Sequence, residues 1–246
     1  MAQVVTKALV IREQPYQERD KLLTLFTETA GKQKAIARGV RHNKSSMVAA
    51  TQLFAYSEFV YYPGKNFASV NSATLIEPFY PLRGDVHKMA LGSMVLEILD
   101  GLFDFYQGDA RLLKLANYVL YYLSNDLCVD DRVPVAAFAL KGAASQGIGP
   151  VLSHCTNCGR TEDLLYFNIE GGGAVCRDCS HEFGETYRML PDQLTEMQKL
   201  LKADVKSLRQ LKLTDEMAKR IFELLTNHLG YRLNRRMNAF RFYGSL

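Results

Sequence analysis

The segment "VVTKALVIREQPYQERDKLLTLFTETAGKQKAIA", residues 4–37, indicates the fold of the N-terminal part of the chain. It contains three runs rich in β-branched and aromatic residues, "VVTKALVI", "LLTLFTE" and "KQKAIA". Turn-forming residues separate these runs in "PYQERD" and "ETAGK". Short runs of this composition between turn formers are typical of β-strands. The segment therefore predicts three strands, at residues 4–11, 22–28 and 32–37.

Two further runs continue the pattern, "LFAYSEFVYY" at residues 53–62 and "FASVNSATLI" at residues 67–76. Five short strands with one longer loop fit a small, partly closed barrel such as an OB-fold. An SH3-like barrel would show the same alternation, so periodicity alone leaves both barrels open. We expect residues 1–80 to form one β-barrel domain.

From residue 85 the apolar residues recur with the period of a helix. One helical face carries Leu91, Val95, Ile98, Leu102 and Phe105. Further helices are expected at residues 110–124, 133–147, 192–203 and 214–229, the last with Thr214 as its N-cap. The fold class is therefore α+β and multidomain. We expect an N-terminal OB-fold barrel followed by an α-helical domain, residues 81–246, interrupted by a cysteine segment at residues 152–182.

Four cysteines form two Cys-x-x-Cys pairs, Cys155/Cys158 and Cys176/Cys179, with 17 residues between them. Each pair can supply two thiolates to a tetrahedral zinc ion, and "LLYFNIEGGGAV" between the pairs reads as two short strands joined by glycines. This is the arrangement of a zinc ribbon or knuckle. A redox dithiol is the alternative. Four thiolates leave no open coordination position, so we expect one structural Zn²⁺ and a solvated or supporting role for His154.

The chain has neither an apolar run of 18 residues nor the charge and apolar pattern of a signal peptide. We therefore expect a cytosolic protein with reduced thiols, in which Cys128 is a small buried or half-buried hydrophobe. Residues 1–80 carry ten basic and six acidic side chains, and the segment from residue 191 carries eleven and six. The residues between them are net acidic. Two basic ends suggest a polyanionic partner.

No acidic residue occurs between Glu28 and Glu58. The candidate DNA-binding residues in this interval are Lys32, Lys34, Arg38, Arg41 and Lys44. Strand alternation places Lys32 and Lys34 on one face, and spread cations without carboxylates suit a phosphate-binding groove. Aromatic residues that could stack on bases follow at Phe54, Tyr56, Tyr61, Tyr62 and Phe67. The alternative is a solvated basic face over core aromatics, and solvation is equally open for Arg235 and Arg236 in the tail.

The sequence contains no Walker-type loop, no His-Glu-x-x-His and no Gly-x-Ser-x-Gly motif. The glycines at residues 171–173 lack the Lys-Ser/Thr that completes a phosphate loop. The neighbouring carboxylates at residues 130–131 and 162–163 are read as solubilising or capping groups. We therefore expect a protein without enzymatic activity and without a small-molecule substrate.

Three segments resemble RecO, a family of bacterial recombination mediators: "ALVIREQPYQERDKLLTLFTETAGKQKAIARGVR", "LFAYSEFVYY" and "GIGPVLSHCTNCG…VCRDC". The first of them includes the family's "Y.E.DK" turn and its "LT/FT…GK" hairpin. The resemblance covers nearly the whole chain, most tightly residues 4–62 and 142–180. All four cysteines are retained, which is similar to the zinc-bearing branch of the family.

The resemblance implies an OB-fold that binds single- and double-stranded DNA and anneals complementary strands. It also implies that the protein, with RecR, helps to load RecA onto DNA coated by the single-strand binding protein SSB, whose acidic C-terminal tail it recognises. By position, the family's basic strand and loop correspond to Lys34, Arg38, Arg41 and Lys44. The expected place of action is the cytoplasm, at the nucleoid, without membrane association.

Two alternatives stay open at this point. One is an RNA- or ribosome-associated module, because a barrel combined with a zinc ribbon also suits RNA. The other is a scaffold whose basic face binds an acidic protein without any nucleic acid.

Overall fold

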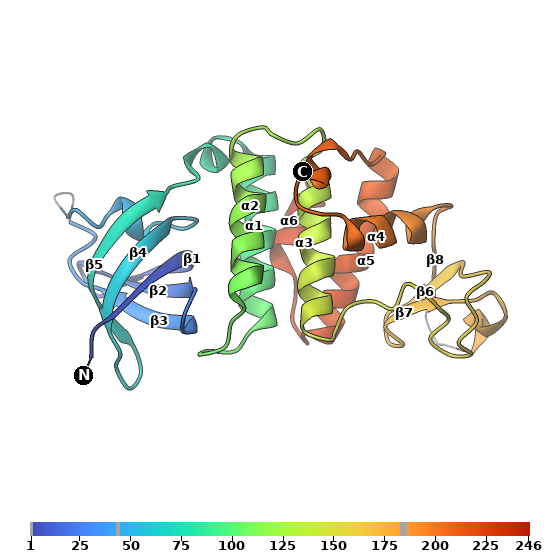
Figure 1. Ribbon diagram of the computed structural model, residues 1–246, viewed down its shortest axis with the longest axis horizontal. Coiled ribbons are helices and arrows are strands. Elements are labelled where there is room, and N and C mark those ends of the chain that lie inside the picture. Colours follow the sequence, from blue (N-terminus) through green and yellow to red (C-terminus); the bar gives the residue numbers. More distant parts are fainter. Residues whose placement is uncertain (1, 43–44, 183–185) are drawn as a thin grey trace. The chain divides into compact units, whose positions relative to one another are not determined.

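The computed structural model describes residues 2–42, 45–182 and 186–246 (Figure 1). The chain packs into two compact units, residues 1–125 and residues 126–246. The predicted domains, residues 1–80 and 81–246, were divided where the strand pattern of the sequence changes to a helical pattern. This division stays a prediction. Among the described residues, no helix is both long and apolar enough to cross a membrane.

The N-terminal part of the first unit is a closed five-stranded barrel with the strand order β1-β2-β3-β5-β4. Its strands are β1 (Val4–Tyr16), β2 (Asp20–Thr27), β3 (Gly31–Ala37), β4 (Tyr56–Tyr62) and β5 (Ala68–Glu77). All neighbouring strands are antiparallel except β3 and β5, which pair in parallel over residues 35–37. The barrel confirms the predicted OB-like fold. Two short 3₁₀ helices, η1 (Ala49–Thr51) and η2 (Tyr80–Gly84), lie in its connections.

Alternation along the strands fills the barrel. Inward positions carry small and large apolar residues in turn, among them Ala8, Val10, Leu23, Leu25, Ala35, Ala37, Phe59 and Tyr61. Strand β1 is longer than the sequence predicted, because residues 12–16 continue to pair with β2 beyond a register shift at Val10/Arg12. The residues of this extension are exposed or half-buried, so they lie outside the barrel core.

Two helices complete the first unit, α1 (Val86–Leu102) and α2 (Ala110–Ser124). Outward-facing residues of the barrel are buried where these helices and the loop between them pack against it. The ring of Phe26, on β2, lies 5.1 Å from that of Phe103 in an edge-on contact. Both helices begin at aspartates: the carboxylates of Asp85 and Asp109 each accept two backbone N–H groups of the first turn. Such N-caps satisfy donors that have no partner within the helix.

The second unit combines helices with a small sheet. Its helices are α3 (Arg132–Ser145), α4 (Gln193–Lys202), α5 (Asp215–Arg232) and α6 (Asn238–Tyr243), with 3₁₀ helices η3 (Asp178–His181) and η4 (Ser207–Gln210). Helix α3 is buried along nearly its whole length, as its apolar sequence requires. Thr214 is the N-cap of α5, as predicted, and its Oγ1 accepts the N–H of Met217 at 3.2 Å.

Asp130 has the capping role that was one of the two expected for the carboxylates at residues 130–131, since its Oδ1 accepts the backbone N–H of Arg132, the first residue of α3, at 3.0 Å. Asp130 is buried rather than solvating, and both of its oxygens accept from the guanidinium of Arg132, at 2.8 and 2.9 Å. Asp130 Oδ2 also accepts the N–H of Leu213, while Arg132 donates to Asp215 at 2.8 Å. This network joins the start of α3 to the start of α5.

Candidate metal centre and nucleic-acid interface

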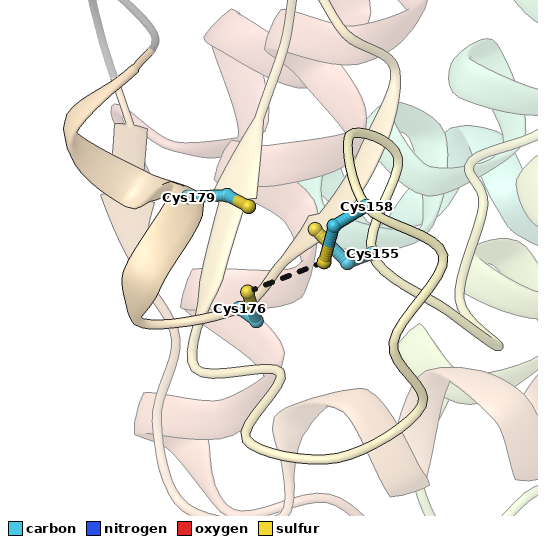
Figure 2. A group of neighbouring side chains, drawn as sticks. All are labelled: Cys155, Cys158, Cys176 and Cys179. Carbon is cyan, nitrogen blue, oxygen red and sulfur yellow. Dashed lines mark hydrogen bonds between the residues drawn. The ribbon is translucent and has the colours of Figure 1, made fainter.

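The four cysteines of the two Cys-x-x-Cys pairs meet in space. The Sγ atoms of Cys155, Cys158, Cys176 and Cys179 all lie within 4.8 Å of one another, and Figure 2 shows the four side chains converging on one point. Between the pairs, the Sγ atoms of Cys158 and Cys176 are 3.8 Å apart. A tetrahedron with metal–sulfur bonds of about 2.3 Å has edges of about 3.8 Å, so this donor set fits zinc.

Each pair sits on a tight turn of similar geometry. The N–H of Gly159 donates to the carbonyl of Cys155 at 2.9 Å, and the N–H of Ser180 donates to that of Cys176 at 3.1 Å. Gly159 has a φ of +76°, a left-handed conformation that glycine adopts without strain. The residue after each second cysteine therefore closes the turn that holds two sulfurs on the same side.

A small sheet brings the two turns together. Strands β6 (Tyr166–Asn168) and β7 (Gly173–Val175) form the predicted hairpin between the pairs. A third strand, β8 (Thr186–Arg188), pairs with β6 and was not expected from the sequence. An ion pair between Arg160 and Asp178, at 2.6 Å, links the first turn to the second.

The surroundings of the cluster shift the pKa values of two of its thiols in opposite directions. Burial raises the pKa of Cys155, but backbone N–H groups of Cys158, Cys176 and Asn157 directed at its sulfur outweigh this effect and lower the pKa. The pKa of Cys179 is raised: the side chain of Asn157 acts in the opposite direction, but burial and the hydrogen bonds with the other thiols prevail. Four thiolates this close repel one another without a compensating positive charge.

The other candidates for sulfur or nitrogen ligation lie apart. Cys128 is not in the cluster, and burial raises the pKa of its thiol to about 11. His154 is exposed, and its Nδ1 lies 2.9 Å from the Oγ of Ser153. The histidine next to the first ligand is therefore a surface residue outside the group of four.

Two of the candidate DNA-binding residues share an exposed surface of the barrel. Lys34 and Arg38 both point outward from β3 and its end, and both are exposed. Strand β5 runs beside them, and Arg38 donates to the Oγ of Ser69 at 3.3 Å. By strand register Phe67 precedes Ala68, the partner of Ala35, so its half-buried ring lies next to the Lys34 side of β3.

Two barrel loops border this surface. The ring of Tyr16, at the β1–β2 turn, lies 6.4 Å from that of Phe67, at the β4–β5 turn. The guanidinium of the exposed Arg41 donates to the carbonyls of Gln17 and Glu18 at 3.2 and 3.1 Å, so it braces the β1–β2 turn. In OB-folds these two loops flank the oligonucleotide-binding face. Sequence reasoning missed Tyr16, because its proximity to Phe67 is non-local.

Lys32 does not belong to the exposed group. Lys32 is buried, and its ammonium donates to the carbonyl oxygen of Asp100 at 2.7 Å and lies 3.4 Å from its carboxylate. Lys32 and Lys34 do share one strand face, since both ammonium groups lie over the ring of Phe105, at 4.9 and 4.7 Å from its centroid. The prediction for Lys44 lies outside the described residues.

The five aromatic candidates divide into core and surface. Phe54 and Tyr61 are buried core residues, which agrees with the alternative that aromatic residues of the strands belong to the core. Tyr56 donates its hydroxyl to Glu28 at 2.6 Å, and burial together with this bond raises its pKa. Tyr62 is exposed, and Tyr56 and Phe67 are both half-buried, so these three of the five are at least partly accessible to a ligand.

Comparisons with known proteins cover both parts of the chain. A family model described as "Recombination protein O N terminal" matches residues 1–79, and one described as "Recombination protein O C terminal" matches residues 83–239. The DNA repair protein RecO of Symbiobacterium thermophilum is 30% identical over 254 residues, which cover 100% of this chain and 98% of that protein. The DNA repair protein RecO of Alkaliphilus metalliredigens is 29% identical over 235 residues, 94% of each chain.

Proposed function

Because the chain belongs to the RecO family of DNA repair and recombination proteins, we propose that it is a non-catalytic, DNA-binding recombination mediator. In this role it binds single- and double-stranded DNA and anneals complementary strands. With RecR it helps to load RecA onto DNA coated by SSB, whose C-terminal tail it recognises. It acts in the cytoplasm, at the nucleoid. Residues 1–80 are the DNA-binding domain, and the partners bind the helical domain, residues 81–246.

One observation supports DNA binding most directly: exposed cations lie between the two loops that flank the ligand face of an OB-type barrel. Lys34 and Arg38 offer charges for phosphates, while Tyr16, Tyr62 and Phe67 offer aromatic rings for bases. Cations and stacking rings together suit a single strand, because its bases are unpaired. We propose Lys34, Arg38, Arg41 and Lys44 as the phosphate-binding residues, and we assign Lys32 to holding the barrel against α1.

The annealing mechanism requires no bond chemistry. Cations on the barrel offset the repulsion between the phosphates of two complementary strands, and the release of counterions favours the complex. Bases that stay partly exposed in the groove can then be tested for complementarity. The protein's contribution is to bring two like-charged chains close enough to pair.

The cysteine cluster is proposed to hold one structural zinc ion. The ligands would be Cys155, Cys158, Cys176 and Cys179, and their number fills the coordination shell. Zinc bound there would fix the two turns and stabilise the segment at residues 152–182. The ion pair of Arg160 with Asp178 is a further contact between the two turns.

The test is fluorescence anisotropy with a labelled mixed-sequence single strand, together with a strand-annealing assay. Arg38→Glu should weaken binding at least about tenfold near 0.1 M salt, since two charges change at the groove. Arg41→Glu should depress annealing as well. Lys219→Glu is the matched control, because it makes the same charge change at an exposed position on α5. Normal annealing by both arginine variants would contradict the proposal.

Two additional ligands separate the rival functions. A matched RNA oligonucleotide that binds more tightly than the DNA would favour an RNA-binding module. Salt-sensitive binding to an acidic peptide, without binding to either oligonucleotide, would favour a protein scaffold. Preference for DNA, with loss on charge reversal at Arg38, is the result that the mediator role predicts.

A further inference from the structure

The loop between α1 and α2, residues 103–109, lies against the edge of β3 (Figure 1). Strand β5 pairs with β3 only from Ala35 onward. Before that point the loop takes the place of a neighbouring strand: the N–H of Lys32 donates to the carbonyl of Gln107, and the N–H of Tyr106 donates to the carbonyl of Lys32, both at 2.8 Å. The loop thereby becomes part of the barrel surface that carries Lys34.

Close backbone packing fixes this loop. A Cβ atom added to Gly31 would lie 2.3 Å from the carbonyl carbon of Gln107, and one added to Gly108 would lie 2.6 Å from the Cα of Gly31. Tyr106 itself has a φ of +70°, in the left-handed region that non-glycine residues rarely occupy. Strained backbone of this kind persists where its surroundings over-determine it, often at binding sites. The tyrosine ring is therefore presented from a rigid base.

The side chains of the loop are those of a nucleic-acid surface. Tyr106 is 67% exposed and Phe105 is 36% exposed. The ammonium of Lys34 lies 4.7 Å from the centroid of the Phe105 ring, so a cation and an aromatic ring are already in contact there. Arg38, Lys34 and Phe105 follow β3 on one side of the barrel, and the exposed Tyr106 is the next residue of the loop.

We propose that this loop is an aromatic extension of the nucleic-acid surface, on which Tyr106 stacks with an unpaired base while Lys34 binds an adjacent phosphate. The inference rests on the proposed function and adds to it a site from outside the barrel strands. It commits to single strands, because stacking on an exposed ring requires a base whose face is free. A duplex, with its bases stacked on one another, gains nothing from Tyr106.

The chain contains no tryptophan, so a single introduced tryptophan reports its own surroundings. Tyr106→Trp should lose fluorescence when single-stranded DNA binds, because a stacked base quenches the indole. Tyr80→Trp is the matched control: Tyr80 is 68% exposed, lies in the same unit and is outside the proposed surface. Quenching at position 106 but not at position 80 supports the proposal. Equal quenching at both positions, or none at position 106 while the protein binds DNA, overturns it.

Affinity gives a second measurement. Tyr106→Asn keeps a residue that tolerates the left-handed conformation and removes the ring. Its affinity for a single strand should fall about fivefold or more, as for the loss of one stacked base, while its affinity for a duplex stays within about twofold. Tyr106→Phe should bind like the wild type. An equal loss for both DNA forms, or no loss, would overturn the stacking role.

The outcomes separate this inference from the proposed function. If Arg38→Glu weakens DNA binding and Tyr106→Asn does not, the DNA-binding role of the barrel is supported and the stacking role of Tyr106 is contradicted. If the wild-type protein binds no DNA, both fall together. Thermal unfolding of each variant shows whether the fold has been kept.

Discussion

The ammonium of Lys32 lies 2.7 Å from the carbonyl oxygen of Asp100, and this contact ties β3 to the end of α1. The Asp100 carboxylate lies 3.4 Å from the same ammonium and 3.0 Å from the guanidinium of Arg12, so it joins both strands to the helix. Two residues further along β3, Lys34 is exposed. Lysines on one strand face thus have different surroundings, one structural and one open to a ligand.

The first prediction separates these two lysines by substitution with methionine. Lys32→Met should lower the free energy of unfolding by about 1–3 kcal/mol, because the carbonyl oxygen of Asp100 loses its charged donor, although the carboxylate keeps its ion pair with Arg12. Lys34→Met should leave stability nearly unchanged, because Lys34 is exposed and its contact with the Phe105 ring is a weak surface interaction. Urea denaturation measures both. Equal destabilisation by the two substitutions would contradict the structural role of Lys32.

The second prediction concerns the salt dependence of DNA binding. With about four phosphate contacts on a single strand, the logarithm of the binding constant should fall with the logarithm of salt concentration with a slope of about −3. Lys34→Met should make this slope about 0.7 shallower, since one contact is lost. Lys32→Met should leave the slope unchanged. Anisotropy titrations at several salt concentrations measure it, and an unchanged slope for Lys34→Met would remove that residue from the groove.

The third prediction concerns metal content. The purified protein should contain one zinc ion per chain, and Cys176→Ser should contain none and unfold at a lower temperature. Cys128→Ser is the control, because Cys128 lies outside the group of four and should retain zinc. Elemental analysis and thermal melts measure both properties. Full zinc content in Cys176→Ser would contradict the assigned ligand set.

The fourth prediction concerns His228, which is fully buried in the second unit. Burial lowers its pKa below the ordinary value of 6.5; its bond to the Ile148 carbonyl, at 2.7 Å, opposes this shift, and the charge of Arg232 adds to it. Below pH 6.5, His228 therefore binds a proton in the unfolded chain but stays neutral in the folded chain until the pH reaches its lowered pKa. The stability due to neutral His228 is present above that pH and is lost as the pH falls, by at most about 1.4 kcal/mol per pH unit.

Urea midpoints between pH 7.5 and pH 5 measure this effect. His228→Leu should show a shallower decline than the wild type, and His154→Gln, at an exposed histidine, should decline like the wild type. The comparison cancels acid effects on the cysteine cluster, which all three proteins share. Parallel curves for wild type and His228→Leu would exclude a titration at His228.

Much of the fold follows from local sequence pattern. Alternation and turn residues predicted all five barrel strands, and the 3.6-residue period with the Thr214 N-cap predicted the long helices. The expected helical position of Phe105 was wrong, because α1 ends at Leu102 and Phe105 lies in the loop that bridges to Lys32. Strand order was not predictable in this way, because OB and SH3-like barrels share the same alternation. Strand β8 was missed since three residues carry too short a pattern.

Some parts of the candidate sites could be predicted from the sequence, and others could not. Cysteine spacing predicted which four sulfurs would meet, because Cys-x-x-Cys is a local geometry. The outward direction of Lys32 and Lys34 followed from alternation, but alternation cannot tell which outward position a helix will cover. The contact between Tyr16 and Phe67, and the loop beside Lys32, depend on segments far apart in sequence.

The α1–α2 loop is synthesised after the strand whose edge it covers, and this order affects the nascent chain. The ribosome makes β3 well before residues 103–109, so a nascent barrel exposes the backbone edge at Lys32 that the finished protein covers. A lysine on an open strand edge discourages pairing with other chains, because association would bury its charge. The Lys32 side chain would therefore disfavour aggregation of the nascent chain. After Asp100 has been synthesised, the same side chain forms the contact that links β3 to α1.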